Sequence, residues 1–292
     1  MISLISSNSF SISVKDIFFD KTGSKASTTT NETVGKNNIL SLKLLANSLE
    51  TRLNGAASML EFASNLSEMR SMPNATLLNA TLEGLHGIPS YSDLQKRMIA
   101  QKVISYYPEI AGISFIMPNG DTYFMEPYSL QSNQTKNNLA FRDYFMGAIS
   151  SNQTYLGDII TSTSSGLKRA IIAVPVFSND DDNNGVLSGV LVGSIDLGLL
   201  SKETQSFNLP QEQRIVYVDS KGIKIADSDK RFSINNSESF SNLNSFQYAL
   251  AGKFGSTVEE VSHETMLISY YPMDAIQNRW IILLMQPVVD VI

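Results

Sequence analysis

The stretch FRDYFMGAISSNQTYLGDII, residues 141–160, decides the fold together with the two apolar segments that follow it. SSGLKRAIIAVPVF (164–177) and GVLSGVLVGSID (185–196) are rich in Val, Ile and Ala, a composition typical of strands. The pattern predicts a short helix and three strands, with Arg142 beside aromatic residues and Asp196 ending the last strand. An arginine, aromatic rings and a carboxylate on a curved sheet indicate a small-molecule pocket rather than a catalytic centre.

A similar order of elements occurs a second time, about 100 residues further on. AGISFIM (111–117) leads through a Pro-Asn-Gly-Asp turn into TYFME (122–126), a hairpin pattern. RIVYVD (214–219) leads through Ser-Lys-Gly into IKIAD (223–227) in the same way. In both copies a helical segment and two strands, one with a proline, come next. The repeat predicts two small α+β units with antiparallel sheets.

A long helix is predicted ahead of both units, from Asn38 to about Met72, where Pro73 would end it. About 35 helical residues span roughly 50 Å, enough to run beside two stacked units. A second helix is expected over 92–107. The apolar stripe of the long helix suits packing inside the chain and contact with a homodimer partner equally well. Its members are Leu42, Leu45, Leu49, Leu53, Ala56, Leu60 and Ala63.

These patterns divide the chain into four parts. Residues 1–37, rich in Ser, Thr, Lys and Asn, are expected to form an N-terminal tether. Residues 38–90 hold the long helix and a connection, 91–204 the first unit, and 205–292 the second unit.

Composition limits the chemistry. A net charge of -6 argues against nucleic acid as a partner, because no basic stripe is present to neutralise phosphates. The absence of cysteine excludes disulfides, thiolate metal sites and cysteine nucleophiles. His86 and His263 are the only histidines, so a histidine-rich metal site is not expected, and no cofactor is implied. Metalloprotease, Walker A, nucleophile-elbow and nicotinamide motifs are also missing from the sequence.

The acidic loop around Asp180 resembles the start of a calcium loop, but its twelfth position is Leu191 instead of a bidentate glutamate. A polar hairpin loop is therefore favoured there.

Glycan-acceptor triplets favour an extracytoplasmic location, since Asn-x-Ser/Thr is modified on secreted and surface proteins. No apolar run of 18 residues is present, so no membrane span is predicted within this sequence. The triplets begin at Asn31, Asn65, Asn74, Asn79, Asn133, Asn152 and Asn235.

Over residues 38–290 the chain resembles the double Cache family, the extracytoplasmic ligand-binding domains of chemoreceptors and sensor kinases. The resemblance rests on FRDYF (141–145), YLGD (155–158), the strand over 164–177 and GVLVGSIDL (189–197). It implies two stacked PAS-like units behind a long N-terminal helix, with the ligand in the first, membrane-distal unit. It also implies membrane helices flanking the domain and no enzymatic activity.

In amino-acid-binding members of that family an Arg-x-Trp-Tyr motif holds the ligand carboxylate. By resemblance Arg142 matches the arginine, and Asp196 matches an aspartate that helps to hold the ligand ammonium. Tyr144 and its neighbour Phe145 replace the two aromatic residues of the motif. The positions of a further tyrosine and aspartate fall on Ile160 and on Ser162. These departures leave a carboxylate, another amine or a larger polar metabolite as alternatives to an ordinary amino acid.

The residues themselves support this assignment and also offer structural roles. Arg142 presents a planar fork suited to a carboxylate, but it could also pair with Asp143. Tyr144 offers an aromatic face and a hydroxyl, or packing. Asp196 could meet a ligand ammonium, or cap the helix that LGLLSKE predicts. Further candidates for the lining of the same cavity are Tyr123, Met125, Tyr128, Tyr155, Asp158 and Ser162.

The sequence therefore predicts a sensory module in which a small polar metabolite is held by Arg142 and Asp196, with Tyr144 as a wall. A surface adhesion module is the main alternative. A secreted hydrolase that uses two carboxylates is the other.

Overall fold

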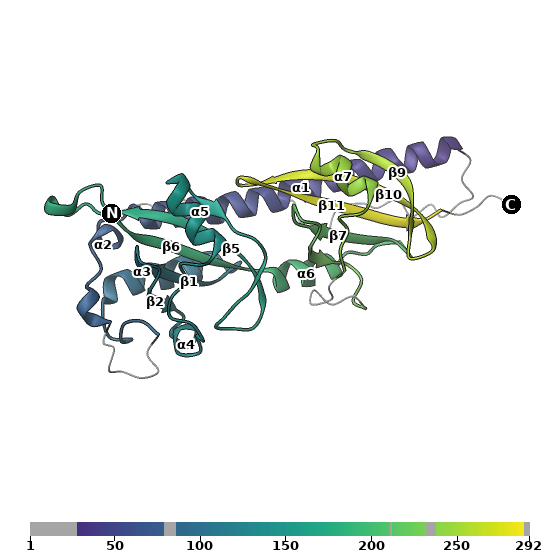
Figure 1. Cartoon of the computed structure of the whole chain (residues 1–292). Coiled ribbons are helices and arrows are strands. Elements are labelled where there is room, and N and C mark those ends of the chain that lie inside the picture. The colour runs from purple at the N-terminus through teal and green to yellow at the C-terminus, as the bar shows by residue number, and fades with distance from the viewer. Residues whose placement is uncertain (1–27, 79–85, 211, 232–237, 289–292) are drawn as a thin grey trace, which may run out of the picture.

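The computed structural model describes residues 28–78, 86–210, 212–231 and 238–288, and consists of one long helix with two antiparallel sheets beside it (Figure 1). The long helix α1 (Thr28–Ser64) runs along one face of both sheets. The α+β architecture with two stacked units is confirmed.

The first unit is built on a sheet in the order β2-β1-β6-β5-β3, with β4 also paired to β5. All of its strand pairs are antiparallel. Its strands are β1 (Ile110–Ile116), β2 (Thr122–Glu126), β3 (Tyr155–Leu156), β4 (Ile160–Thr161), β5 (Lys168–Phe177) and β6 (Leu187–Asp196). Its helices are α3 (Leu94–Tyr106), α4 (Tyr128–Ser132), α5 (Asp143–Ser151), α6 (Leu197–Gln205) and the 3-10 turn η3 (Asp181–Asn183). The region predicted as a helix and three strands therefore holds four strands, because β3 and β4 are two short pieces.

The second unit repeats that order as β8-β7-β11-β10-β9. Its elements are β7 (Arg214–Val218), β8 (Lys224–Asp227), α7 (Asn244–Leu250), β9 (Gly255–Val261), β10 (Glu264–Ala275) and β11 (Asn278–Pro287).

The predicted repeat is confirmed at the level of single residues. Pro175 on β5 pairs with Val190, and Pro272 on β10 pairs with Ile281 in the corresponding place. The turns match as well: Leu139 N–H donates to the carbonyl of Gly120, and Phe240 N–H donates to that of Gly222. Both glycines have positive φ and lie against the chain that follows, where a Cβ atom would clash with backbone. The strand registers therefore match β1, β2, β5 and β6 of the first sheet with β7, β8, β10 and β11 of the second.

Helix α1 differs from the prediction at both ends. It begins at Thr28, so residues 28–37 belong to the helix and not to a tether; residues 1–27 lie outside the described residues. It ends at Ser64 rather than near Met72, and a separate short helix, α2 (Ser67–Arg70), follows. A 3-10 turn, η2 (Ala75–Leu77), comes next. After this break, Met69 of α2 is fully buried in the core that α1 shares with the sheets.

The apolar stripe of α1 is buried inside the chain, from Leu42 (0% exposed) to Ala63 (1% exposed). It packs on one face of each sheet, and this single core runs under both units. A homodimer formed through that stripe is therefore not supported, because intramolecular packing already covers it. The exposed side of α1 is mostly polar, with Leu40, Leu44 and Phe62 as its large apolar exceptions among the described side chains.

The two units also touch directly. The Gln277 side chain, in the turn between β10 and β11, accepts from Leu156 N–H at 2.8 Å and donates to the Leu156 carbonyl at 2.7 Å. Asn278 donates to the same carbonyl. Lys221 of the second unit pairs with Asp158 of the first. The second unit therefore rests against the strand that follows helix α5.

Candidate functional site

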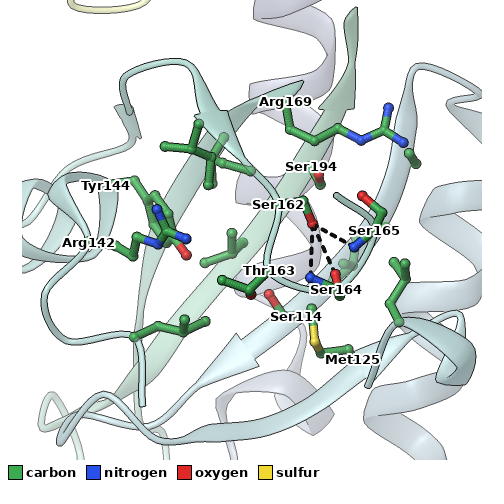
Figure 2. A pocket seen from close by; sticks show the side chains of 18 residues that line it. Ser114, Met125, Arg142, Tyr144, Ser162, Thr163, Ser164, Ser165, Arg169 and Ser194 are labelled. Atoms are coloured by element: carbon green, nitrogen blue, oxygen red, sulfur yellow. Dashed lines mark hydrogen bonds between the residues drawn. The ribbon is translucent and has the colours of Figure 1, made fainter. Parts of the chain in front are cut away.

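A pocket of about 60 Å³ lies on the face of the first sheet that points away from α1 (Figure 2). One water needs roughly 10–15 Å³, so the pocket has room for several waters or a compact molecule. The sheet forms the floor, while α4, the start of α5 and the β4–β5 loop form the cover. The lining comprises Ala111, Gly112, Ile113, Ser114, Met125, Leu130, Leu139, Arg142, Tyr144, Ile160, Ser162, Thr163, Ser164, Ser165, Arg169, Ile171, Val192 and Ser194.

Strand alternation selects which residues face this pocket. On β5, Arg169 and Ile171 line it, whereas Ala170 between them belongs to the core under α1. On β6, Ser194 lines the pocket and its neighbour Ile195 faces α1. Because successive side chains of a strand point to opposite faces, the polar residues of these strands gather on one side.

Arg142 holds the N-cap position of α5 with extended backbone (φ -76°, ψ 137°), which places its side chain at the pocket. Its guanidinium lies 5.0 Å from the ring centre of Phe141. Its Nε atom is buried and has no hydrogen-bond partner among the described residues. Leaving such a group unsatisfied costs about 1–3 kcal/mol or more, so a bound anion would be stabilised there.

Tyr144, in the first turn of α5, is 4% exposed and forms the wall beside Arg142. Burial raises the pKa of its hydroxyl to about 12, although the charge of Arg142 acts in the opposite direction. The hydroxyl is therefore protonated at neutral pH and can donate a hydrogen bond to a ligand.

The β4–β5 loop supplies hydroxyl groups. Ser162 Oγ accepts from the backbone N–H groups of Ser164 (3.3 Å) and Ser165 (3.2 Å), as Figure 2 shows. Gly166 follows with φ 69°, a left-handed conformation that glycine adopts without strain. The turn keeps several serine side chains at the rim of the pocket.

Arg169 is the second cation of the lining, and it is paired. Its Nη1 lies 2.5 Å from Oδ1 of Asp196, its register partner on β6. The contact is an ion pair without the alignment of a good hydrogen bond. Asp196 Oδ1 also accepts from Gly198 N–H at 2.8 Å, so it caps α6. The structural role foreseen for Asp196, that of an N-cap, is confirmed.

Four of the nine predicted site residues line the pocket: Arg142, Tyr144, Met125 and Ser162. Asp196 does not line it and reaches it only through Arg169.

The structure places the other four predicted residues elsewhere, which corrects the prediction that they share the cavity. Tyr123 is fully buried on the α1 side, where its hydroxyl donates to Asp93. Tyr128 stacks on Arg97, 5.6 Å from its guanidinium carbon. Tyr155 packs on helix α5. Asp158 points to the second unit, where it pairs with Lys221 (see above).

Sequence reasoning missed Arg169, Ser114 and Ser194. A charged residue within the apolar segment KRAIIAVPVF was the available indication, since a buried charge requires a partner. The serines carried no such indication, because only the strand register brings them to the same face.

The lining contains no aspartate or glutamate, whereas a carboxylate-based hydrolase requires two of them across one cleft. Among the described residues, no group of three potential metal ligands is present. The acidic loop around Asp180 connects β5 to β6, as the hairpin interpretation predicted. His263 is exposed and lies 3.6 Å from Glu260, and His86 contacts Asn137.

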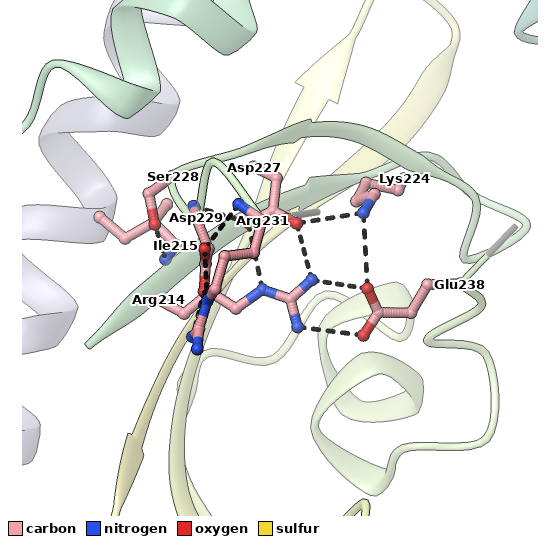
Figure 3. Close-up of polar contacts among 8 residues, drawn as sticks. All are labelled: Arg214, Ile215, Lys224, Asp227, Ser228, Asp229, Arg231 and Glu238. Atoms are coloured by element: carbon pink, nitrogen blue, oxygen red, sulfur yellow. Dashed lines mark hydrogen bonds and ion pairs between the residues drawn. The ribbon is translucent and has the colours of Figure 1, made fainter. Parts of the chain in front are cut away.

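The matching face of the second sheet is filled. Val216, Phe240, Phe246, Leu283 and Met285 belong to a buried apolar cluster there. One end holds an ion-pair network in which Arg214 contacts Asp227 (2.6 Å) and Glu238 (2.5 Å), and Lys224 contacts both carboxylates (Figure 3). Burial by itself would lower the pKa of Arg214. The hydrogen bonds and charges of Asp227 and Glu238 have the larger combined effect, so its pKa is raised.

In the described part of the chain no helix has both the length and the apolar character needed to cross a bilayer.

A sequence profile of the Cache domain family, dCache_1, matches residues 24–292. Among curated proteins, none matches the sequence.

Solved structures share the fold. The extracellular domain of a protein described as a histidine kinase, rpHK1S-Z16, has a TM-score of 0.66 at 17% identity, covering 90% of this chain and 97% of its own. The ligand-binding domain of the Pseudomonas aeruginosa amino acid chemoreceptor PctB with L-Arg has a TM-score of 0.59 at 14% identity, covering 88% and 96%. The corresponding domain of PctC from the same organism, with GABA, has a TM-score of 0.57 at 13% identity, covering 84% and 96%.

Proposed function

The chain belongs to the Cache domain family, and from that premise we propose that it is the extracytoplasmic ligand-binding domain of a transmembrane signalling receptor. A small polar metabolite binds in the pocket of the first unit. The domain senses this ligand and catalyses no reaction.

One observation carries the proposal: the guanidinium of Arg142 lies at a pocket with a buried, unpartnered Nε atom and no carboxylate in the lining. Planar guanidinium groups bind carboxylates in a two-pronged manner. Tyr144 adds a protonated hydroxyl beside it. These groups favour an anionic group of the ligand at this point.

The position of the two units supports the first as membrane-distal. Asn38, near the start of α1, donates to the side chain of Gln286 at the end of β11. The described chain thus begins and ends at the second unit, as Figure 1 shows. If both ends lead to the membrane, the second unit lies next to it and the pocket lies away from it.

We expect helix α5 to transmit the effect of ligand binding to the second unit. Asp143, which follows Arg142, accepts a hydrogen bond from Asp158 N–H at 2.6 Å, and the Asp158 side chain pairs with Lys221. Binding that favours one position of α5 therefore biases the contact between the units. Hydrogen exchange on the chain with and without ligand should show altered protection at the Gln277 turn. Unaltered protection throughout the second unit would contradict this transmission.

The proposal is tested by a thermal-shift screen of the 292-residue chain with amino acids, organic acids, amines and purines. Arg142→Ala should abolish stabilisation by any hit, with affinity lowered on the order of 100-fold for the loss of about 3 kcal/mol. Leu243→Ala is the matched control, since Leu243 holds the N-cap of α7 in the second unit. It should lower stability and leave the affinity unchanged. Unchanged binding by Arg142→Ala would refute the assignment.

An adhesion module is the second candidate. The acceptor residues Asn65, Asn74, Asn133 and Asn152 are all exposed, as glycan attachment requires. A broad library without a single hit would favour this function over sensing.

A further inference from the structure

We infer that the pocket selects a compact carboxylic acid that lacks an amino group, such as a hydroxy acid, over the corresponding amino acid. The inference rests on the proposed ligand-binding function and specifies the ligand class. It follows from the charges that face the pocket and from how Asp196 is engaged.

The charges of the lining have one sign. Arg142 and Arg169 are its only ionisable residues that carry charge at neutral pH among the described residues. A ligand carboxylate is attracted by the guanidinium of Arg142, whereas the charge of Arg169 is balanced by Asp196. A ligand ammonium would be repelled by Arg142, and it would lose its hydration shell without gaining a counter-ion from the lining.

The carboxylate that contacts the lining residue Arg169 is already neutralised. Asp196 is held at 2.5 Å by Arg169 and accepts the capping hydrogen bond from Gly198. The Arg169 side chain is 8% exposed and the Asp196 side chain 26% exposed, so the guanidinium side of this pair is the more shielded from water. An ammonium group would have to displace a buried guanidinium to reach Asp196, and that guanidinium would then lose its partner.

Hydroxyl groups supply the remaining polarity. Besides Tyr144, the lining includes six serine and threonine side chains: Ser114, Ser162, Thr163, Ser164, Ser165 and Ser194. Hydroxyl groups both donate and accept, so they suit a ligand hydroxyl or keto oxygen as well as carboxylate oxygens. The volume of about 60 Å³ favours a molecule of few carbon atoms.

Arg169 is the specificity-determining residue in this scheme. The strand register makes Met266 its counterpart in the second unit, since Arg169 pairs with Asp196 and Met266 pairs with Pro287. A methionine is therefore compatible with this strand position. Arg169→Met should release the Asp196 carboxylate towards the pocket and admit an amine.

Titration calorimetry on the 292-residue chain tests the inference with pairs of compounds, each made of a carboxylate without an amino group and the corresponding amino acid. The pairs are glycolate and glycine, L-lactate and L-alanine, and succinate and L-aspartate; inorganic phosphate is a further anion. At least one carboxylate should bind, with its amino-acid counterpart weaker by about 10-fold or more, or 1.4 kcal/mol. An amino acid that binds as tightly as its counterpart overturns the inference, as does phosphate that binds more tightly than every carboxylate.

Two variants complete the test. In Arg169→Met the preference for the carboxylate over its amino acid should fall by about 10-fold. Asp196→Asn retains a side chain that caps helices well, and it should not gain affinity for the amino acid. An unchanged preference in Arg169→Met, with the fold verified by circular dichroism, overturns the role of Arg169. If Arg169→Met does not fold, a gain of amino-acid binding by Asp196→Asn overturns it instead.

Failure of this inference is distinguishable from failure of the proposed function. Binding of amino acids alone would refute the ligand class and leave a sensor domain in place. If none of the seven compounds binds, the inference is overturned, and the library screen decides separately whether the pocket binds a ligand at all.

Discussion

The two units share one fold, but among the described residues the outer face of the first sheet holds a pocket, whereas that of the second sheet carries a buried apolar cluster. The strand registers and turns make the comparison residue by residue. At five matched positions the first unit has a polar side chain, and the second unit has an apolar or smaller one. The pairs are Arg142 and Leu243, Tyr144 and Ser245, Ser114 and Val216, Ser194 and Met285, and Arg169 and Met266.

At one end of the matched faces the difference is reversed, because there the second unit has the charged residues. Gly112 and Met125 line the pocket of the first unit, whereas their counterparts Arg214 and Asp227 form the ion-pair network of the second. A Cβ atom on Gly112 would lie 2.4 Å from Cδ1 of Leu130, so the Leu130 side chain packs over Gly112 in a place that a larger residue would make it leave. The same backbone thus holds either a solid core or a cavity, depending on a few side chains.

The largest expected effect compares Phe145 with its counterpart Phe246, both buried in the helix that covers the sheet. Each change to alanine should lower the free energy of unfolding by about 3–5 kcal/mol, because it leaves a cavity. Urea denaturation measures this. Only Phe145→Ala should also weaken ligand binding, since α5 presents Arg142 and Tyr144. Equal binding by both variants would remove the functional distinction between the units.

The second largest loss of stability is expected for Asp227→Asn. Asp227 is 1% exposed and contacts both Arg214 and Lys224, so the change leaves buried cations with one fewer counter-charge. The expected loss is about 3 kcal/mol in urea denaturation. Arg231→Ala, at an exposed arginine that pairs with Asp229, is the control and should change little. A loss no greater than that of the control would show that the network does not stabilise the second unit.

Filling the pocket with the residue of the second unit should have an intermediate effect. Ser194→Met should occupy the cavity and weaken binding by about 10-fold or more, while stability changes by less than about 1.5 kcal/mol. Titration calorimetry and urea denaturation measure the two quantities. Met285→Ser is the reciprocal control and should destabilise the chain without affecting binding. Wild-type affinity in Ser194→Met would place the ligand outside this pocket.

The smallest expected effect is a pH dependence of the stability that Glu238 gives to the second unit. Burial acts to raise the pKa of Glu238, but the charge and hydrogen bonds of Arg214 prevail and lower it below 4.5. A lowered carboxyl pKa stabilises the fold above the unfolded-state value, and this is lost as pH falls through the folded-state value. The destabilisation by Glu238→Gln should therefore be larger at pH 7 than at pH 3.

Urea denaturation at both pH values measures that difference. Glu264→Gln, at an exposed carboxyl that begins β10, is the control and should show the same small change at both. An equal loss for Glu238→Gln at pH 7 and pH 3 would contradict the charge-based stabilisation.

Much of the fold was predictable from local patterns. The alternating apolar residues and the Gly120 and Gly222 turns predicted both hairpins, and the proline-bearing strands predicted the repeat. The ends of α1 were not predictable, because Thr28–Asn37 is polar enough to resemble a loop. The start of α1 contacts residues of the second sheet that are distant in sequence. Gln286, which accepts a hydrogen bond from Asn38, lies more than 240 residues later in the chain.

The candidate site was predictable in part. Arg142 and Tyr144 stand in a local motif, and the structure places both at the pocket. Tyr123 was predicted there because it lies on the first hairpin with Met125, but a register shift between β1 and β2 interrupts the alternation and leaves Tyr123 in the core on the α1 side. Arg169 was missed because its importance depends on its partner 27 residues later in the chain, across a strand pair.

The sequence by itself determined the family, the two-unit repeat and the arginine at the start of α5, because these depend on periodicity and on motifs of neighbouring residues. Tertiary structure alone decided which unit holds a cavity and which charges face it. The register of β5 against β6 joins Arg169 to Asp196, and so turns a carboxylate that could have held an amine into the partner of a buried cation. Such pairing depends on residues far apart in sequence, which no local pattern of this chain records.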